Sequence, residues 1–363
     1  MGRHESWPLT RDEAGTFGHP DPSMPAAVAH SRIRVGVSRI LDRHGRLGSD
    51  DGASEPGVSC VPYSPPTKAV SRRVGVELLV LTAIAAGCTP DDRTGEAPHP
   101  DAIASRIVAL APNAAEIVWE LGAGSRLVGV SDFAVYPPAL AELPRVGGLR
   151  DADLERILTL QPDLVILRGR QAKLEELCRT RGIRVYHDPT ETLPDLYRAV
   201  ERLGVLCDRR DAAIRLTQRL RDDLDAVQHR VADRPPVSVL LTIRSPDRLA
   251  DITTAARGSY LHDVIELAGG RNVFGELDIA YPQVTVEEIV ARGPTVILEA
   301  VPGADSAATA AMPAQWQSLP TIPAVRTGRI HVLTEDYVLI PSPRVVHLAD
   351  RIAALLHPEV GRE

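Results

Sequence analysis

Cys88 is the side chain whose surroundings point most directly to a chemical modification. The small residues at 85–87 (Ala-Ala-Gly) directly precede its thiol and resemble a lipobox. Two arginines and then the apolar run VGVELLVLTAIAA at 74–86 come before them. A basic patch, a short apolar core, small residues and a polar exit are typical of a cleaved signal peptide. We therefore predict a lipoprotein signal peptide over 70–88 with lipidation at Cys88, and a plain signal or a buried helix remains the alternative.

The residues on either side of this segment suggest how the protein is held. Residues 1–69 are rich in Pro, Gly, Ser, Arg and Asp and show no sustained helical or strand period, so they are either a disordered leader or lie upstream of the true translation start. Residues 89–104 form a polar linker. The expected location is therefore extracytoplasmic, with a lipid anchor in a cell membrane.

The remaining cysteines and histidines do not predict a metal site. Cys178 and Cys207 lie in segments with helical periodicity, and the sequence contains no CxxC, CxxH or HExxH spacing. Buried thiols are the commoner fate of such cysteines. In an exported protein a disulfide between the two is the open alternative. His187, which follows a predicted strand, is the one histidine expected near a cleft.

Motifs for cofactor binding and catalysis are missing or out of context. The glycines at 122 and 124 follow a helical segment, and a leucine occupies the third glycine position of a dinucleotide motif. No P-loop and no Gly-x-Ser-x-Gly elbow is present. A formal net charge of −7 gives no reason to expect nucleic acid as a partner. We predict no catalytic residues and no resident cofactor.

These residues have to be positioned by an α/β fold. The stretch LPRVGGLRDADLERILTLQPDLVIL at 143–167 reads as a loop, a helix, a proline break and a strand buried on both faces. Strands and helices alternate in the same way before and after it, which argues for parallel sheets with helices on their faces. A charge-rich helix over 209–231 would span about 35 Å and suits a rigid connector.

The two ends of this connector carry similar units. LERILTLQPDLVIL at 154–167 matches VEEIVARGPTVIL at 286–298 in kind: an acidic helix start, an apolar period, a proline break and a buried strand. Two similar α/β lobes leave a cleft between them, where ligand pockets commonly form.

An ordered set of motifs gives this chain a family resemblance. RIVALAPNAAEIVWELGAGSRLVGVSDFAVYPP, LPRVGG, LERILTLQPDLVIL, LAGGRNVF, YPQVTVEEIVARGPTVIL and LPTIPAVRTGRIHVL resemble the solute-binding proteins of ABC importers for cobalamin and ferric siderophores. The resemblance covers about residues 105–357. It implies a class III periplasmic binding protein (a helical-backbone metal receptor), with two Rossmann-like lobes and parallel sheets. The expected boundaries are 105–206 for the N-terminal lobe, 207–234 for the connecting helix and 235–357 for the C-terminal lobe.

The resemblance also implies the partners. They are a metal chelate and an ABC permease dimer with its ATPase. It places Glu155 and Glu287 where the family carries one carboxylate per lobe for docking on permease arginines. Two fixed charges favour correct docking by giving an electrostatic register. Both residues are also helix-start carboxylates, which the helix dipole favours by about 0.3–1 kcal/mol, and Glu288 is an alternative to Glu287.

The family's ligand-binding loops supply the expected binding residues. Aromatic rings suit flat macrocycles or catecholates, and arginines suit anionic chelates. Cobalamin binders tend to be aromatic where this chain has Leu149, so a ferric siderophore or haem stays open beside cobalamin. The ligand-binding positions implied are Phe133, Tyr136, Leu149, Arg150, Arg168, Arg170, Arg244, Tyr281, Asp336 and Tyr337. An exported two-lobe enzyme acting on a metal-containing ligand, and a surface sensor or adhesion module, are the alternatives.

Overall fold

The computed structural model describes residues 101–245 and 248–359, which belong to one structural unit, Gly87–Glu363. The predicted leader, the signal peptide with Cys88 and most of the predicted linker lie outside the described residues. No helix in the described part of the chain is long and apolar enough to cross a membrane.

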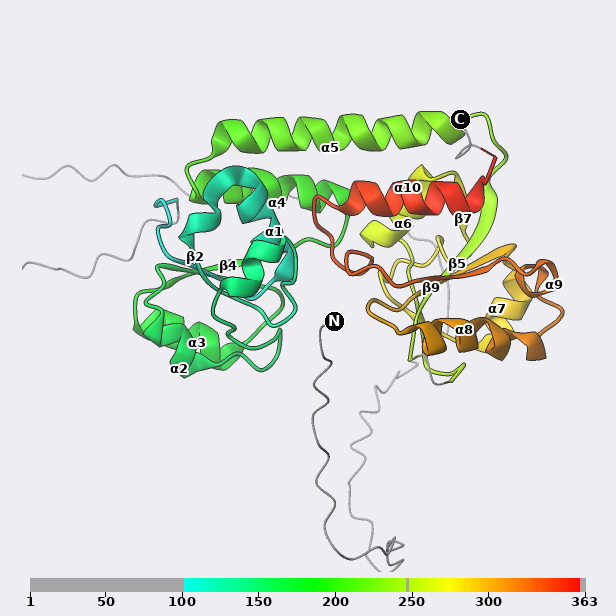
Figure 1. Ribbon diagram of the computed structural model, residues 1–363, viewed down its shortest axis with the longest axis horizontal. Coiled ribbons are helices and arrows are strands. Elements are labelled where there is room, and N and C mark those ends of the chain that lie inside the picture. Colours follow the sequence, from blue (N-terminus) through cyan, green and yellow to red (C-terminus); the bar gives the residue numbers. More distant parts are fainter. Residues whose placement is uncertain (1–100, 246–247, 360–363) are drawn as a thin grey trace, which may run out of the picture. The chain divides into compact units, whose positions relative to one another are not determined.

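The N-terminal lobe is a parallel sheet covered by helices on both faces (Figure 1). Its strand order is β2-β1-β3-β4, and the bounds are β1 Ile107–Ala109, β2 Leu127–Val130, β3 Leu164–Leu167 and β4 Arg184–His187. The helices are α1 Pro112–Val118, α2 Leu154–Thr159, α3 Ala172–Thr180 and α4 Leu193–Leu206. Short helical turns occupy Trp119–Ala123 (η1), Gly124–Arg126 (η2) and Pro138–Glu142 (η3).

Alternation along the strands explains why this sheet is buried on both sides. In β3, Leu164 and Ile166 join the core beneath α1 and α4, whereas Val165 and Leu167 join a second cluster with α2 and α3. Successive side chains of a strand point to opposite faces, so a run of four apolar residues supplies two cores at once.

The C-terminal lobe contains a mixed sheet. The bounds of its strands are β5 Val237–Ile243, β6 Ile252–Thr254, β7 Gly270–Asn272, β8 Gln283–Val284, β9 Val296–Ala300 and β10 Ile330–Leu333. The path of the sheet is β10-β9-β5-β6-β8, with β7 paired to β5. Its helices are α6 Tyr260–Leu267, α7 Val286–Arg292, α8 Ser306–Gln315, α9 Pro323–Thr327 and α10 Val345–Leu356, with a 3-10 turn, η4, at Trp316–Ser318.

This sheet corrects the expectation of purely parallel strands. β6 runs antiparallel to β5, and β8 antiparallel to β6, although β9, β10 and β7 are parallel to their neighbours. The described residues between β5 and β6 contain no helix, and a parallel pairing would need a longer crossover connection. The sequence does not predict β7, β8, α8 or α9. The two strands have three and two residues, α8 is rich in alanine and α9 has five residues, so none of them carries a clear periodicity.

The long helix α5, Arg210–Val231, connects the two lobes. Its buried residues recur every three or four positions and form one stripe. This stripe packs on α4 and η1 of the N-terminal lobe and on α6 and α10 of the C-terminal lobe, and Figure 1 shows α5 running along α4 and α10. One continuous apolar cluster therefore extends through both lobes beneath α5.

Candidate ligand-binding cavity

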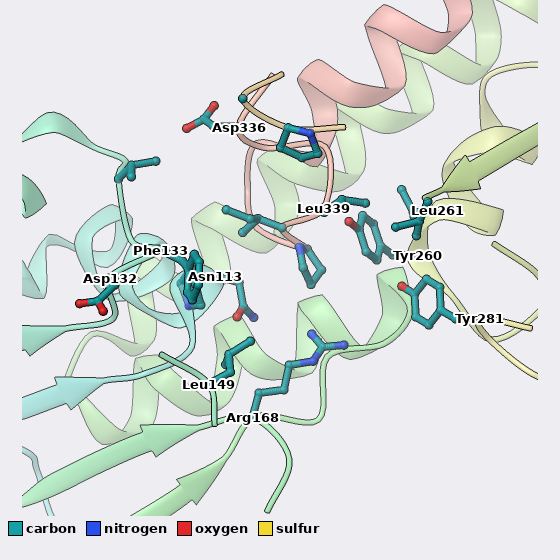
Figure 2. A pocket seen from close by; sticks show the side chains of 17 residues that line it. Asn113, Asp132, Phe133, Leu149, Arg168, Tyr260, Leu261, Tyr281, Asp336 and Leu339 are labelled. Carbon is teal, nitrogen blue, oxygen red and sulfur yellow. The ribbon is translucent and has the colours of Figure 1, made fainter. Parts of the chain in front are cut away.

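A cavity of about 620 Å³ lies where loops of the two lobes meet (Figure 2). The segments after β1, β2 and β3 supply its N-terminal wall with Asn113, at the start of α1, Phe133 and Arg168. Because the carboxyl ends of parallel strands lie at one edge of a sheet, these side chains meet although they are far apart in sequence. Five of the ten predicted ligand-binding residues line the cavity: Phe133, Leu149, Arg168, Tyr281 and Asp336.

The walls of the cavity are largely apolar. Phe133 and Leu149 leave 61% and 37% of their surfaces exposed, and both line this one cavity, so they form a local patch of uncovered apolar surface. Leu261 and Leu339 face them from the C-terminal lobe (Figure 2). Uncovered apolar surface inside a concave site gains free energy when a ligand buries it, at about 25 cal/mol per Å².

Arg168 carries the only positive charge among the described residues that line the cavity. Its guanidinium lies 2.7 Å from the Glu191 carboxylate and keeps 25% of its side chain exposed. Tyr281 faces the same region, and its pKa is raised mainly by desolvation and then by the charge of Glu191. The Tyr281 phenol is therefore a neutral hydroxyl group, able to donate a hydrogen bond beside a cation.

The base of the cavity joins the two lobes. The amide of Tyr260, at the start of α6, donates to the Glu191 carbonyl, and the amide of Leu193 donates to the Asp263 carboxylate over 2.9 Å. The Tyr260 hydroxyl donates to the Val338 carbonyl over 2.9 Å. The first two bonds join the lobes next to the cavity, and the third fixes Tyr260, which lines it, within the C-terminal lobe.

A buried ion pair also crosses between the lobes. Nε and Nη2 of Arg344 donate to the two carboxylate oxygens of Glu116, on α1, over 2.9 and 2.5 Å. A third guanidinium nitrogen donates to Asp336 over 2.7 Å. Burial raises the pKa of Glu116, and the hydrogen bonds from Arg344 and Ser342 oppose that shift. Neither the sequence pattern nor the family motifs pointed to this pair.

Two predicted ligand-binding residues, Tyr136 and Tyr337, contact Arg344 of this ion pair and do not line the cavity. The guanidinium of Arg344 lies 4.2 Å from the centre of the Tyr136 ring and 5.5 Å from that of Tyr337. Asp336 lines the cavity and bonds to the same guanidinium. Tyr136 and Tyr337 therefore pack around the Arg344 guanidinium, which connects the two lobes through Glu116.

The other predicted arginines lie away from the cavity. Arg150 is exposed beside a separate surface hollow near α3, and the Arg170 side chain is 87% exposed with Glu175 at 3.8 Å. The side chain of Arg244 is completely buried: it donates to Glu299 over 2.7 Å and to the Gln315 side chain over 2.9 Å. Its partner Glu299 also accepts from the Trp316 indole over 3.0 Å. The structure gives Arg244 a place in the C-terminal core.

Asn113 and Tyr260 line the cavity but were not predicted. A signal for Asn113 existed, since it is a polar residue at the start of the helix that follows the first strand, at the sheet edge that also carries Phe133. No comparable signal marks Tyr260, which begins an amphipathic helix. Within the described residues, no group of three or more His, Cys, Asp or Glu side chains is arranged to hold a metal ion.

Glu155 and Glu287 occupy matching positions on α2 and α7. Both are exposed, and neither side chain forms a hydrogen bond or ion pair with another described residue. Glu288 instead closes a capping box with Thr285, which occupies its carboxylate. Each helix is followed by a residue with positive φ and then a proline: Gln161 (φ 47°) after α2 and Gly293 (φ 57°) after α7.

The two described cysteines are free thiols in different apolar clusters. Cys207 lies in the cluster beneath α5, and Cys178 lies in the cluster on the other face of the N-terminal sheet. Burial raises the pKa of each thiol to about 11. The disulfide left open by the sequence is therefore not formed between Cys178 and Cys207 in this structure.

Two α/β lobes, one long helix packed on both and a cavity at the carboxyl ends of parallel strands define a class III binding protein. The chain belongs to the periplasmic binding protein family, whose model matches residues 107–337. The vitamin B12-binding protein of Vibrio parahaemolyticus is 30% identical over 244 residues, which are 67% of this chain and 86% of that protein.

Solved structures agree with this assignment. The periplasmic vitamin B12 binding protein of Vibrio cholerae is 28% identical with a TM-score of 0.60, over 72% of this chain and 99% of that one. A periplasmic haem binding protein from Pseudomonas aeruginosa is 27% identical with a TM-score of 0.62, over 70% and 94%. The chain is thus an extracytoplasmic solute-binding component of an ABC importer, and the enzyme alternative has no support in these relatives.

Proposed function

We propose that the cavity captures a metal chelate with a broad apolar body and at least one polar or anionic group. The observation that carries this proposal is that exposed Phe133 and Leu149 share one cavity with Arg168, the only cation among the described residues that line it. Relatives of similar identity are named for binding vitamin B12 and haem, both of which combine a flat macrocycle with peripheral polar groups. A ferric siderophore is the third candidate.

Titration of the purified protein with cyanocobalamin, haemin and ferric siderophores, followed by absorbance and melting temperature, tests this proposal. We expect one of them to bind with one site per chain and to be released unchanged. Arg168→Gln should weaken that binding about tenfold, because a charge-assisted hydrogen bond in a partly desolvated site is lost. The matched control is Arg170→Gln, whose side chain is 87% exposed and lies outside the cavity. Failure of every chelate to bind would refute the proposal.

We also propose that Glu155 and Glu287 dock the protein on its permease. Their exposure, their matching positions and their lack of partners among the described residues support this role. Double reversal to lysine should abolish uptake and leave ligand affinity in solution unchanged, because two salt bridges become two repulsions. Glu142→Lys with Asp223→Lys changes the same number of exposed charges and serves as the control. Normal uptake by the first double variant would contradict the docking role.

Membrane attachment through lipidated Cys88 completes the proposal. The supporting observation is the sequence pattern before this cysteine. Cys88→Ser should move the protein from the membrane fraction to the soluble fraction of the exported pool. An unchanged distribution in cell fractionation would remove the lipid anchor from this account.

A further inference from the structure

Asn113 is held in one orientation by a buried carboxylate. Its side-chain Nδ2 donates to Oδ2 of Asp188 over 2.7 Å, and the Thr190 hydroxyl donates to Oδ1 of the same carboxylate over 2.6 Å. Asn113, Asp188 and Thr190 keep only 2%, 4% and 0% of their surfaces exposed. All three are therefore shielded from bulk water. A hydrogen bond lost at this buried site cannot be replaced by one to water.

This arrangement fixes which amide atom faces the ligand. A carboxylate is an acceptor only, so the atom that Asn113 turns toward Asp188 has to be its NH2 group. The amide oxygen, Oδ1, must then point away from Asp188. This oxygen forms no hydrogen bond to another described residue. It is also not one of the fully buried atoms without a partner, so part of its surface is accessible. Asn113 lines the cavity, and Figure 2 places it on the side that also carries Phe133, Leu149 and Arg168.

The backbone makes this orientation rigid. Asn113 is the second residue of α1, directly after the loop that follows β1. Asp188 directly follows β4, and its own amide donates to the Leu167 carbonyl over 2.8 Å. Both residues are thus fixed to the same parallel sheet, and the polar atom presented to the cavity is set before any ligand enters.

We propose that Asp188 is a positioning residue that makes Asn113 a hydrogen-bond acceptor for the ligand, and that the ligand carries an N–H or O–H donor at this point. This inference rests on the proposed function and narrows its ligand class. A chelate with peripheral carboxamides fits both side chains, since a carboxamide can donate a hydrogen bond to Asn113 and accept one from Arg168. A porphyrin whose periphery holds only hydrocarbon and carboxylate groups offers no donor to Asn113.

The decisive variant is Asp188→Asn. The new amide can donate to Asn113, which lets the Asn113 side chain turn its NH2 group toward the cavity. Affinity for cyanocobalamin, which carries primary carboxamides, should fall about tenfold, the effect of one hydrogen bond at a desolvated site. Affinity for haemin should change less than twofold. Asp223→Asn, at an exposed position on α5, makes the same chemical change outside the cavity and serves as the control.

Three results would overturn the inference while the proposed function stands. They are an unchanged cyanocobalamin affinity in Asp188→Asn, an equal loss for both probes, or a wild-type protein that binds haemin and not cyanocobalamin. If the wild-type protein binds no chelate at all, the proposed function fails first.

A measurement without ligand separates these cases. The side-chain NH2 protons of Asn113, assigned by their absence in Asn113→Ala, should exchange slowly with solvent in the wild-type protein because they are donated to a buried carboxylate. In Asp188→Asn the same protons should exchange faster. Fast exchange in the wild-type protein would refute the orientation itself.

Discussion

Arg244 and Arg344 each bury a guanidinium against a glutamate, but they connect different parts of the molecule. The Arg244–Glu299 pair lies inside the C-terminal lobe, and both side chains are 0% exposed. The Arg344–Glu116 pair joins the two lobes at the edge of the cavity, with side chains 9% and 3% exposed. Asp336, the third member of that cluster, is 45% exposed, so water reaches one end of it.

The different locations of the two ion pairs indicate different structural roles for Arg244 and Arg344. Arg244 pairs with the core carboxylate of Glu299, whose Oε1 also accepts from the Trp316 indole, and it therefore stabilises one lobe. Arg344 spans 228 positions in sequence to reach Glu116, and it therefore sets the spacing of two lobes. A buried pair is costly to break, because the remaining charge has lost both water and partner. Where the pair lies decides whether stability or cavity shape suffers.

The largest effect is expected for Arg244→Met. It leaves the fully buried Glu299 without its cation, so the free energy of unfolding should fall by about 3–5 kcal/mol, measured by urea denaturation. Arg248→Met removes one partner of an exposed pair, with side chains 69% and 70% exposed, and should cost less than about 1 kcal/mol. A stable Arg244→Met protein with weakened ligand binding would restore the ligand-contact role first expected for this residue.

Arg344→Met should have a smaller effect on stability and a distinct effect on geometry. Glu116 keeps a hydrogen bond from Ser342, so the loss should be about 1–3 kcal/mol. Spin labels at Lys173→Cys and Arg326→Cys, one on each lobe, should report a broader distance distribution than in the wild-type protein. Cys60 and Cys88 would be replaced by serine for this experiment.

The control for this variant is Arg219→Met, which breaks the exposed pair with Glu120. It should leave both stability and the distance distribution unchanged. An equally narrow distribution in Arg344→Met would show that α5 and the cavity floor alone fix the lobes, and the distinction between the two arginine pairs would then disappear.

The smallest effect is a change in the pH dependence of Arg344→Met. Burial raises the pKa of Glu116, and loss of the guanidinium removes the main opposing influence. The folded variant should therefore hold a proton on Glu116 at a pH where the unfolded chain has lost it. That stabilisation is present at acid pH and is lost as the pH rises through the folded-state pKa. The stability deficit relative to wild type should shrink between pH 7 and pH 4.5 in denaturation series, and a constant deficit would mean that Glu116 does not titrate in this window.

Most helices and strands could be predicted from residue patterns within a single segment of the sequence. The stretch at 143–167 contains the predicted helix, α2 with its cap at Asp153, and ends in the predicted buried strand, β3. The charge-rich helix predicted over 209–231 is α5, Arg210–Val231. Their signals are local: a breaker, a period and a cap within one segment. The antiparallel edge of the second sheet was missed because pairing direction depends on how the chain returns after β5, which periodicity does not record.

The site was harder to predict because its contacts are long-range. The family resemblance implied that Phe133 and Arg168 lie in ligand-binding loops, and both line the cavity, each after a parallel strand. Arg244 also follows a strand, but its partner Glu299 lies 55 positions away, and nothing near Arg244 in sequence shows that its charge is already satisfied. The Asn113–Asp188 bond spans 75 positions and was invisible for the same reason.

The apolar cluster beneath α5 also limits how this protein can be re-engineered. Side chains from β1, α4, α5, β9 and α10 belong to that single cluster. A chimera that takes one lobe from this chain and the other from a relative would cut through it and mismatch the packing along α5. Ligand preference is more readily exchanged by replacing the side chains of Phe133, Leu149 and Arg168, which do not belong to that cluster.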